Sequence, residues 1–491
     1  MDQMMGDAMQ KIVVIGAGPA GITAACELLK QSDKYEVVVL EASQQVGGLA
    51  KTVCDRENRI DLGGHRFFAK DERIISWWTD ILPVVDTVDA DRHENVMLIR
   101  KRISRIRYHH HFYDYPVQLN RQTLKKLGFI RATGVLFSYL GAVIHKRPER
   151  SLEDFYRNRF GERLYRLFFR SYTYKLWGVP ASQIAKDWGQ QRVRGLSVRR
   201  MLWERFSLCR RQDREITAEH FAYPKYGPGQ LWSCAAAQIE NMGGEILMGY
   251  RVVEIREQAS RICSVVCETP DGRREISGDI FVSSMPMRDL VTGMQHVPGH
   301  IYTIAADLPY RSMVIVTVEI QLKPGQSYPK DCWIYAQEPG VQAGRIQIYN
   351  NWSPWMVEDP TCTVLLGLEY FCNMHDAVYD RDPADWKRVV LSDLRKLALF
   401  TAPVVVKRVH CIQVPDAYPG YYGSYEYIDD IRGYLDTYEN LYVIGRNGQH
   451  RYHNMEHAMQ TAMRAVTHIV QQDHDTRDIW GVNQAAEYIE K

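Results

Sequence analysis

Three glycines near the start of the sequence have the spacing of a phosphate-binding turn. Gly16, Gly18 and Gly21 form a GxGxxG pattern that follows the apolar run at 12–15 and precedes a helical pattern. The first glycine permits a tight turn, the second lets the backbone approach a pyrophosphate, and the third lets the helix pack closely on the strand. The free N–H groups at the start of that helix then face the anion. The pattern predicts a dinucleotide site.

The acid that such a site needs stands at the end of the next apolar run. Residues 35–41 read YEVVVLE, and Glu41 can accept hydrogen bonds from ribose hydroxyls. Two further glycine motifs follow, a GG pair at 47–48 and DLGGH at 61–65. Glycine pairs are needed where the backbone passes close to a large, extended cofactor. This order of motifs resembles that of the FAD-binding, amine-oxidase-like flavoproteins, which implies FAD as the cofactor, and the sequence has no second GxGxxG for a separate nicotinamide domain.

The elements that must position these residues are far apart in the sequence. Short, continuous apolar runs are typical of parallel strands buried on both faces, and three such runs occur, at 12–15, 35–41 and 441–444. A helical pattern runs from about 455 to 471. We therefore expect an α/β protein in which a Rossmann-like FAD-binding domain carries an inserted helical region and an antiparallel sheet domain.

The expected segments interleave. The FAD-binding domain is expected to have a first part, a second part and a C-terminal part, at 11–74, 226–300 and 405–475. The segment 75–225 reads mostly as helix and is expected to form a substrate or lid region. Alternating stretches such as MVIVTVEIQL predict an antiparallel substrate sheet at 301–404, and 476–491 is expected to be a C-terminal tail.

Composition excludes several classes of protein. The 491 residues are 45% hydrophobic and 24% charged, a globular balance that excludes a disordered or fibrous chain. Lys and Arg number 61 and Asp and Glu 59, so we expect no nucleic acid partner. The ten cysteines form no CxxC pair and the triplet His109–His111 would alternate in direction on a strand, so we expect no metal site. The first ten residues have no apolar run of a signal peptide, which predicts a cytoplasmic protein.

One apolar segment, ATGVLFSYLGAVI at 132–144, is too short to span a membrane. Its flanks are basic, with Lys125, Lys126 and Arg131 before it and Lys146 and Arg147 after it. The pattern favours a buried helix, and a helix resting on a membrane surface is the alternative.

Four longer segments carry a family resemblance. They are GGHRFF at 63–68, FYDYPVQLN at 112–120, LFFRSYTYKLWGVPASQI at 167–184 and YVIGRNGQHRYHNMEHAMQTA at 442–462. In this order they resemble the motifs GAHxFH, FxLPxNxxT, FFxxYTxKxWG and FxGRxxxYRYxDM of the UDP-galactopyranose mutases. That family lies within the superfamily of FAD-dependent amine oxidases and protoporphyrinogen oxidases.

The resemblance, added to the glycine motif, implies a flavin site with these residues: Gly16, Gly18, Gly21, Glu41, Gly48, Gly64, His65, Gly445 and Met455. It also implies a substrate site. In that site Tyr172 stacks on the nucleotide base, Trp177 lines the sugar pocket, and Arg345 and Arg199 bind the diphosphate. The remaining substrate residues lie in the last motif and are His450, Arg451, Tyr452 and Asn454.

Two of these positions depart from the family pattern, because His450 stands for a tyrosine and Asn454 for an aspartate. They leave the sugar and the nucleotide open. The candidate catalytic residues are His65 and Arg345.

The activity implied by the resemblance is the interconversion of pyranose and furanose forms of a nucleotide-diphosphate sugar, as in cell-surface polysaccharide biosynthesis. Reduced FAD would act through a covalent N5–sugar adduct, with NADPH or NADH as the external reductant. Two alternatives stay open: a net oxidoreductase of the amine oxidase or protoporphyrinogen oxidase type, and a non-catalytic flavin-binding partner of a glycosyltransferase. A peripheral membrane association and a homo-oligomer are also open.

Arginines are dense just after the third motif, at positions 192, 194, 199, 200 and 205. Guanidinium groups bind phosphate through paired hydrogen bonds. The cluster therefore predicts either a phosphate-binding loop or a solvated, charged face.

Overall fold

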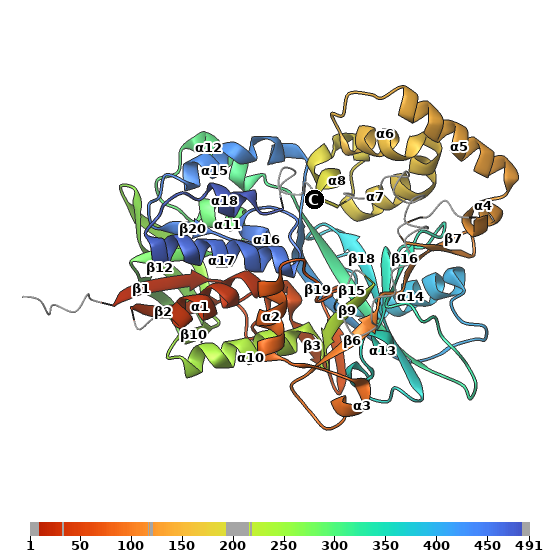
Figure 1. The fold of residues 1–491 in the computed structure, drawn as a ribbon, viewed down its shortest axis with the longest axis horizontal. Coiled ribbons are helices and arrows are strands. Elements are labelled where there is room, and N and C mark those ends of the chain that lie inside the picture. Colours follow the sequence, from red (N-terminus) through yellow and green to blue (C-terminus); the bar gives the residue numbers. More distant parts are fainter. Residues whose placement is uncertain are drawn as a thin grey trace, which may run out of the picture.

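The structure, a computed structural model, describes residues 9–31, 34–115, 117, 121–192, 216 and 219–483 (Figure 1). Its first layer is a five-stranded sheet with the order β10-β2-β1-β14-β20, in which every neighbouring pair is parallel. The strands are β1 (Gln10–Ile15), β2 (Tyr35–Glu41), β10 (Glu245–Met248), β14 (Ile280–Ser283) and β20 (Leu441–Val443). The expected parallel sheet of distant strands is confirmed.

Both faces of this sheet are covered. Ile12 and Val14 of β1 face a helical layer, while Val13 and Ile15 face the opposite side. The helical layer on the side of Ile12 and Val14 consists of α1 (Pro19–Gln31), α2 (Glu72–Ile81), α10 (Pro228–Asn241) and α17 (Met455–Gln471). The layer on the side of Val13 and Ile15 contains β11 (Arg251–Gln258), β12 (Arg261–Thr269), α11 (Met287–Thr292), α12 (Gly299–Ala306) and α15 (Ile428–Leu435). Strand β13 (Gly272–Ser277) pairs with β12. Burial on both faces is why β1 is apolar from Ile12 to Ile15.

A seven-stranded sheet with the order β19-β15-β18-β17-β16-β7-β8 forms the second half of the molecule. Its strands are β7 (Ser104–Tyr108), β8 (His111–Asp114), β15 (Tyr310–Gln321), β16 (Trp333–Ala336), β17 (Arg345–Ile348), β18 (Thr363–Cys372) and β19 (Val405–Pro419). Only β16 and β7 pair in parallel. Helix α14 (Pro383–Leu397) covers one face.

The antiparallel sheet expected at 301–404 is present, but it is larger than expected. Strand β19 pairs with β15 along its whole length, although it begins at Val405 and lies wholly in the segment expected to belong to the FAD-binding domain. Strands β7 and β8 come from a segment expected to be mostly helical, and His109 and His110 form the turn between them. A further small sheet contains β5 (Val84–Val85), β6 (Met97–Lys101) and β9 (His220–Pro224).

The remaining inserted segment is helical, as expected. Figure 1 shows these helices gathered at one end of the molecule, above the seven-stranded sheet. They are α4 (Arg121–Leu127), α5 (Phe129–Ile144), α6 (Leu152–Leu164), α7 (Arg170–Trp177) and α8 (Lys186–Arg192).

The expectation of a buried helix at 132–144 is wrong for much of α5. Val135 is buried, but Phe137 is 72% exposed and Ile144 is 73% exposed. The helix packs on α6 through one side only, so its other side remains at the surface. Among the described helices, none is long and apolar enough to cross a membrane.

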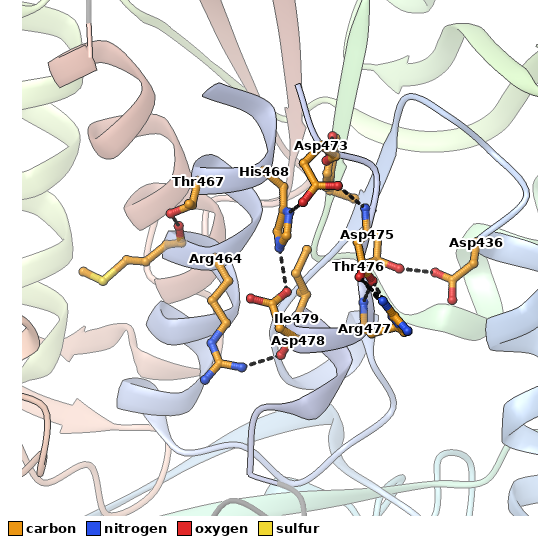
Figure 2. Close-up of polar contacts among 12 residues, drawn as sticks. Asp436, Arg464, Thr467, His468, Asp473, Asp475, Thr476, Arg477, Asp478 and Ile479 are labelled. Carbon is orange, nitrogen blue, oxygen red and sulfur yellow. Dashed lines mark hydrogen bonds and ion pairs between the residues drawn. The ribbon is translucent and has the colours of Figure 1, made fainter. Parts of the chain in front are cut away.

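The chain after α17 is fastened back onto that helix (Figure 2). The Nδ1 atom of His468 lies 3.2 Å from an Asp473 carboxylate oxygen, and its Nε2 atom lies 2.7 Å from Asp478. Asp478 belongs to α18 (Arg477–Gly481), whose Trp480 carbonyl accepts a hydrogen bond from Arg451. The last helix thereby supports the arginine–tyrosine segment of the candidate site.

Candidate functional site

One cavity of about 1350 Å³ runs from the carboxyl ends of the parallel strands to the seven-stranded sheet. Its lining includes Ile15 and Glu41 at one end and Met313, Gln347 and Tyr418 at the other. Pockets for drug-sized ligands enclose roughly 300–1,000 Å³. The cavity therefore has room for an extended dinucleotide together with a second ligand.

The glycine motif forms the first end of this cavity. A Cβ atom on Gly21 would lie 1.8 Å from the carbonyl oxygen of Gly16, so α1 can pack on the turn only with glycine at that position. Gly18 and Gly48 face each other at the cavity wall, where a Cβ on Gly48 would lie 3.1 Å from the Cα of Gly18. This narrow backbone cradle at the start of a helix fits a pyrophosphate.

Glu41 joins the glycine turn to the end of β2. One carboxylate oxygen accepts a hydrogen bond from the Ala17 N–H group and the other from the Ser43 N–H group, both at 2.9 Å. The side chain also lines the cavity, in the position expected for a ribose partner. The residues at this end fit the flavin dinucleotide that the motif predicts.

The two polar residues of DLGGH have different tasks. Asp61 ends the hairpin of β3 (Thr52–Asp55) and β4 (Asn58–Asp61), and it accepts hydrogen bonds from the Thr52 and Tyr223 hydroxyls. Burial raises the pKa of Asp61 to about 7. The cavity lining includes His65 and not Asp61, so Asp61 holds the loop that presents His65.

His65 offers a buried ring nitrogen to the cavity. Its Nδ1 atom has no hydrogen-bond partner among the described residues. Burial, followed by the nearby charges of Arg446 and Arg345, lowers the pKa of His65 to about 3. The imidazole is therefore neutral near pH 7 and can exchange a hydrogen bond with a ligand.

Arg345 already has an anionic partner. Its Nε atom donates to a Glu369 carboxylate oxygen at 2.8 Å, and its Nη2 atom contacts the same carboxylate and donates to the Tyr418 hydroxyl. Burial opposes the charged form, but the Glu369 carboxylate together with the neighbouring tyrosines Tyr418, Tyr172 and Tyr335 outweighs it, and the pKa of Arg345 lies well above its usual range. The charge of Arg345 is thus largely balanced before any ligand binds.

Arg446 has no such partner in the part of the chain that the structure describes. It follows β20 in the short helix α16 (Gly445–Gly448), and its guanidinium carbon lies 4.7 Å from the ring of Tyr418 and 4.6 Å from that of Tyr452. Its Nε and Nη2 atoms are buried without a hydrogen-bond partner among the described residues, and burial lowers the pKa of Arg446. Because an unpaired buried charge is costly, this guanidinium is a site for an anion.

Most of the predicted site residues line this one cavity. They are Gly16, Gly18, Glu41, Gly48, Gly64, His65, Arg345, Gly445, Tyr452, Asn454 and Met455. The lining also includes Glu369, Tyr418 and Arg446, which the sequence reasoning did not select. The GR pair of the last motif was the available signal for Arg446, whereas Glu369 and Tyr418 lie in no motif.

Besides Gly21, four predicted residues that the structure describes lie outside the cavity lining. Tyr172 packs its ring edge against Tyr335, which lines the cavity, with ring centres 5.6 Å apart. Trp177 is 1% exposed and packs behind Tyr418. Arg451 turns away to the carbonyl of Trp480.

His450, the fourth, is fully buried, and its Nε2 atom lies 3.0 Å from the Gly420 carbonyl oxygen. Burial lowers the pKa of His450 to about 4. The structure does not bring this side chain to the cavity. Arg199 and most of the arginine cluster, at 194, 200 and 205, lie outside the described residues.

The lysine of the YTYKLWG motif has a positioning role. Lys175 donates from its Nζ atom to the carbonyls of Ala336, Val341 and Ala343, at 2.8, 2.9 and 3.0 Å. These carbonyls lie around the turn from β16 to β17, and β17 begins with Arg345. Burial lowers the pKa of Lys175 to about 8.

Within the described ranges, no group of three His, Cys, Asp or Glu side chains is arranged to hold a metal ion.

A family model described as flavin containing amine oxidoreductase matches residues 19–470. The chain belongs to this family. The match spans the glycine-motif helix, the inserted segments and α17, so the flavin amine oxidoreductase fold extends over nearly the whole chain. It supports a flavin-dependent enzyme and the flavin site described above.

Individual relatives within the amine oxidoreductase fold are distant. A probable UDP-galactopyranose mutase from Klebsiella pneumoniae is 24% identical over 183 residues, which are 36% of this chain and 43% of that protein. The alignments span less than half the length of the curated relatives that the chain matches.

Solved structures share the fold of this chain over nearly its whole length. Reduced UDP-galactopyranose mutase has a TM-score of 0.78 at 19% identity, covering 97% of this chain and 99% of that one. A putative protoporphyrinogen oxidase from Exiguobacterium sp. 255-15 has a TM-score of 0.68 at 16% identity, covering 95% and 100%. The expected fold, similar to that of the mutase and within the amine oxidase superfamily, is confirmed.

Proposed function

We propose that the protein is a flavin-dependent mutase that interconverts the pyranose and furanose forms of a nucleotide-diphosphate sugar. Arg446 carries this proposal. Its guanidinium has no carboxylate partner among the described residues and lies beside His65, between the glycine-lined flavin end and the seven-stranded sheet. Arg345 is already neutralised by Glu369, so Arg446 provides the free positive charge that a diphosphate needs.

The chain's own residues divide the work. Gly18, Gly48 and Glu41 hold the flavin dinucleotide, which in its reduced form supplies the nucleophile for the anomeric carbon of the sugar. Arg446 holds the departing diphosphate close to the sugar, so that it can return after the ring has changed size. His65 adds no charge next to that anion because it is neutral, and its Nδ1 atom remains available for a hydrogen bond.

The tyrosines complete the diphosphate site. The rings of Tyr418 and Tyr452 stack with an interplanar angle of 6° and centres 6.0 Å apart, and both contact Arg446. Trp177 packs against Tyr418, and Tyr172 packs against Tyr335, which lines the cavity. This arrangement supports a mutase in which Tyr172 and Trp177 either support the residues that line the cavity or move to contact the ligand when it binds.

A net oxidoreductase is the second candidate, because the family model that matches the chain is that of amine oxidoreductases. Such an enzyme would pass two electrons from its substrate to the flavin and on to an acceptor. The mutase, in contrast, transfers no net electrons, so its turnover consumes no acceptor.

The deciding experiment is anaerobic incubation of dithionite-reduced and oxidised enzyme with a panel of nucleotide sugars. Chromatography should show a furanose product with the reduced enzyme only, and no reductant should be consumed in proportion to product. Consumption of one NAD(P)H or one O₂ for each product would establish the oxidoreductase instead.

Arg446→Gln tests the anion site directly. Loss of a charged hydrogen-bond partner should weaken binding of the nucleotide diphosphate about ten- to a hundredfold, read from flavin absorbance changes on titration, while FAD stays bound. Arg451→Gln is the matched control, because this neighbouring arginine points to Trp480. If the two variants bind the nucleotide diphosphate with equal affinity, the diphosphate does not bind at Arg446.

A further inference from the structure

Helix α5 presents an apolar surface to solvent. Ile130 is 83% exposed, and Phe137 and Ile144 follow it at intervals of seven residues, which places all three on one line along the helix. Leu136, Leu140 and Val143 lie beside that line and are also exposed. We call these six residues the α5 apolar face. Single exposed apolar residues are normal, but a continuous stripe marks an interaction surface.

The opposite side of α5 is firmly packed, so the exposed face is a built feature. Val135 is 1% exposed, and the Ser138 hydroxyl accepts a hydrogen bond from the Arg163 N–H group at 3.1 Å. A Cβ atom on Gly161 of α6 would lie 2.7 Å from the Ser138 carbonyl oxygen. The two helices are therefore in backbone contact, and α5 cannot rotate its apolar face inward.

Cations flank the apolar face at both ends. Lys125 and Arg131 are exposed near the first end, and Lys146, Arg147 and Arg150 are exposed after the last turn. None of these five side chains forms an ion pair with another described residue. An apolar stripe between unpaired cations is complementary to an anionic lipid surface, whose acyl chains and headgroups match the two parts.

We propose that α5 lies on an anionic phospholipid surface, with its apolar face in the headgroup boundary and its flanking cations on lipid phosphates. Figure 1 shows α5 at the outer edge of the molecule, where a flat surface can reach it. A second copy of the chain fits less well. In either direction of pairing, two α5 helices would place cations at each end against cations of the other copy.

The test uses the full-length flavoprotein and sedimentation with phosphatidylglycerol/phosphatidylcholine vesicles or pure phosphatidylcholine vesicles. Wild type should sediment with the anionic vesicles. Phe137→Gln combined with Ile144→Gln should reduce binding about tenfold or more. Lys146→Gln combined with Arg147→Gln should reduce it roughly thirtyfold. The control is Val88→Gln combined with Val405→Gln, since these valines are 76% and 54% exposed far from α5; it should bind as wild type does.

All four proteins should keep their flavin and their thermal midpoint, because every substituted side chain is at the surface. The proposal is overturned if wild type stays in the supernatant, if the α5 double variant binds as well as wild type, or if pure phosphatidylcholine binds as strongly as the anionic vesicles. If wild type is a dimer, the α5 double variant is a monomer and neither binds vesicles, the α5 apolar face is assigned to self-association instead.

Discussion

Two arginines of the cavity differ in whether a carboxylate balances their charge, although both are largely withdrawn from water. Arg345 and Glu369 neutralise each other across neighbouring strands β17 and β18. Among the described residues, Arg446 contacts two tyrosine rings, whose faces attract a cation but do not cancel its charge. Arg345 therefore organises the site, while Arg446 remains available to a ligand.

His450 shows a different use of a buried polar side chain, and it makes stability depend on pH. The pKa of His450 is about 4 in the folded protein, below the ordinary value near 6.5 of an unfolded chain. The unfolded state therefore binds the extra proton between these values, and the stability due to the neutral ring is lost as pH falls below about 6.5. At pH 5.5 this loss is on the order of 1 kcal/mol.

His450→Gln keeps a donor for the Gly420 carbonyl and removes the titration. Denaturant unfolding at pH 7.5 and 5.5 should show a smaller fall in the free energy of unfolding for this variant than for wild type. His474→Gln, at an exposed position, should retain the wild-type fall. Equal pH dependence in wild type and His450→Gln would contradict the buried neutral imidazole.

Sequence reasoning located residues whose roles depend on local spacing and missed those that depend on distant partners. Gly16, Gly18 and Glu41 lie where the motif predicts, because a turn and the ends of two adjacent strands fix them. Whether Arg345 is free or paired depends on Glu369, and no pattern in the sequence joins these two residues. The same holds for His450, which occupies a tyrosine position of the family motif but is enclosed by Tyr310 and Tyr425.

At the scale of elements, Lys175 connects α7 to the turn that begins the Arg345 strand. Lys175→Met keeps the aliphatic stem and leaves three carbonyl groups without this donor. We expect the free energy of unfolding to fall by about 1–3 kcal/mol and the affinity for a nucleotide diphosphate to weaken, since Arg345 loses its support. Lys186→Met, on the exposed surface of α8, is the control for loss of a lysine charge.

Stability is measured by denaturant unfolding and affinity by ligand titration. If both are unchanged in the Lys175→Met protein, the turn from β16 to β17 is stable without the lysine.

Elements with one strong periodic pattern were predicted well. Helix α17 has the predicted extent because a capping Asn454 and a long amphipathic run define both its ends. Strands β7, β8 and β19 were placed in the wrong segments because edge and mixed strands alternate weakly and are stabilised by pairing across the sheet. Burial of α5 was mispredicted for a related reason, since an apolar run does not reveal how many of its sides meet another element.

At the scale of the whole molecule, the cavity lies between two separate cores, that of the parallel sheet and that of the seven-stranded sheet. A dinucleotide bound there contacts both, so its binding should stabilise the entire fold. We expect purified protein to be yellow with one non-covalent FAD. With free FAD at a hundred times its dissociation constant, the stabilisation should be about 2.7 kcal/mol, measured as a shift in thermal unfolding of the apoprotein.

Gly18→Val tests the position of that dinucleotide. A Cβ atom at Gly18 comes no closer than 3.7 Å to Gly48, so the fold accepts it, while the valine methyl groups occupy the cavity wall. The variant should fold, lack flavin and show no thermal shift on addition of FAD. Gly299→Val, at an exposed glycine with open space around it, should behave as wild type. A yellow Gly18→Val protein would move the pyrophosphate elsewhere.

The parallel sheet also sets an order of events during synthesis. Ile12 of β1 pairs with Ile280 of β14, and Phe281 of β14 pairs with Leu441 of β20. At about 5–20 residues per second, the first strands leave the ribosome on the order of tens of seconds before the last one. Until β14 is made, β1 has an open, apolar edge that other nascent chains can join, and β14 then has such an edge until β20 is made. Building one cavity from both ends of the chain therefore leaves an apolar strand edge unpaired until translation has nearly finished.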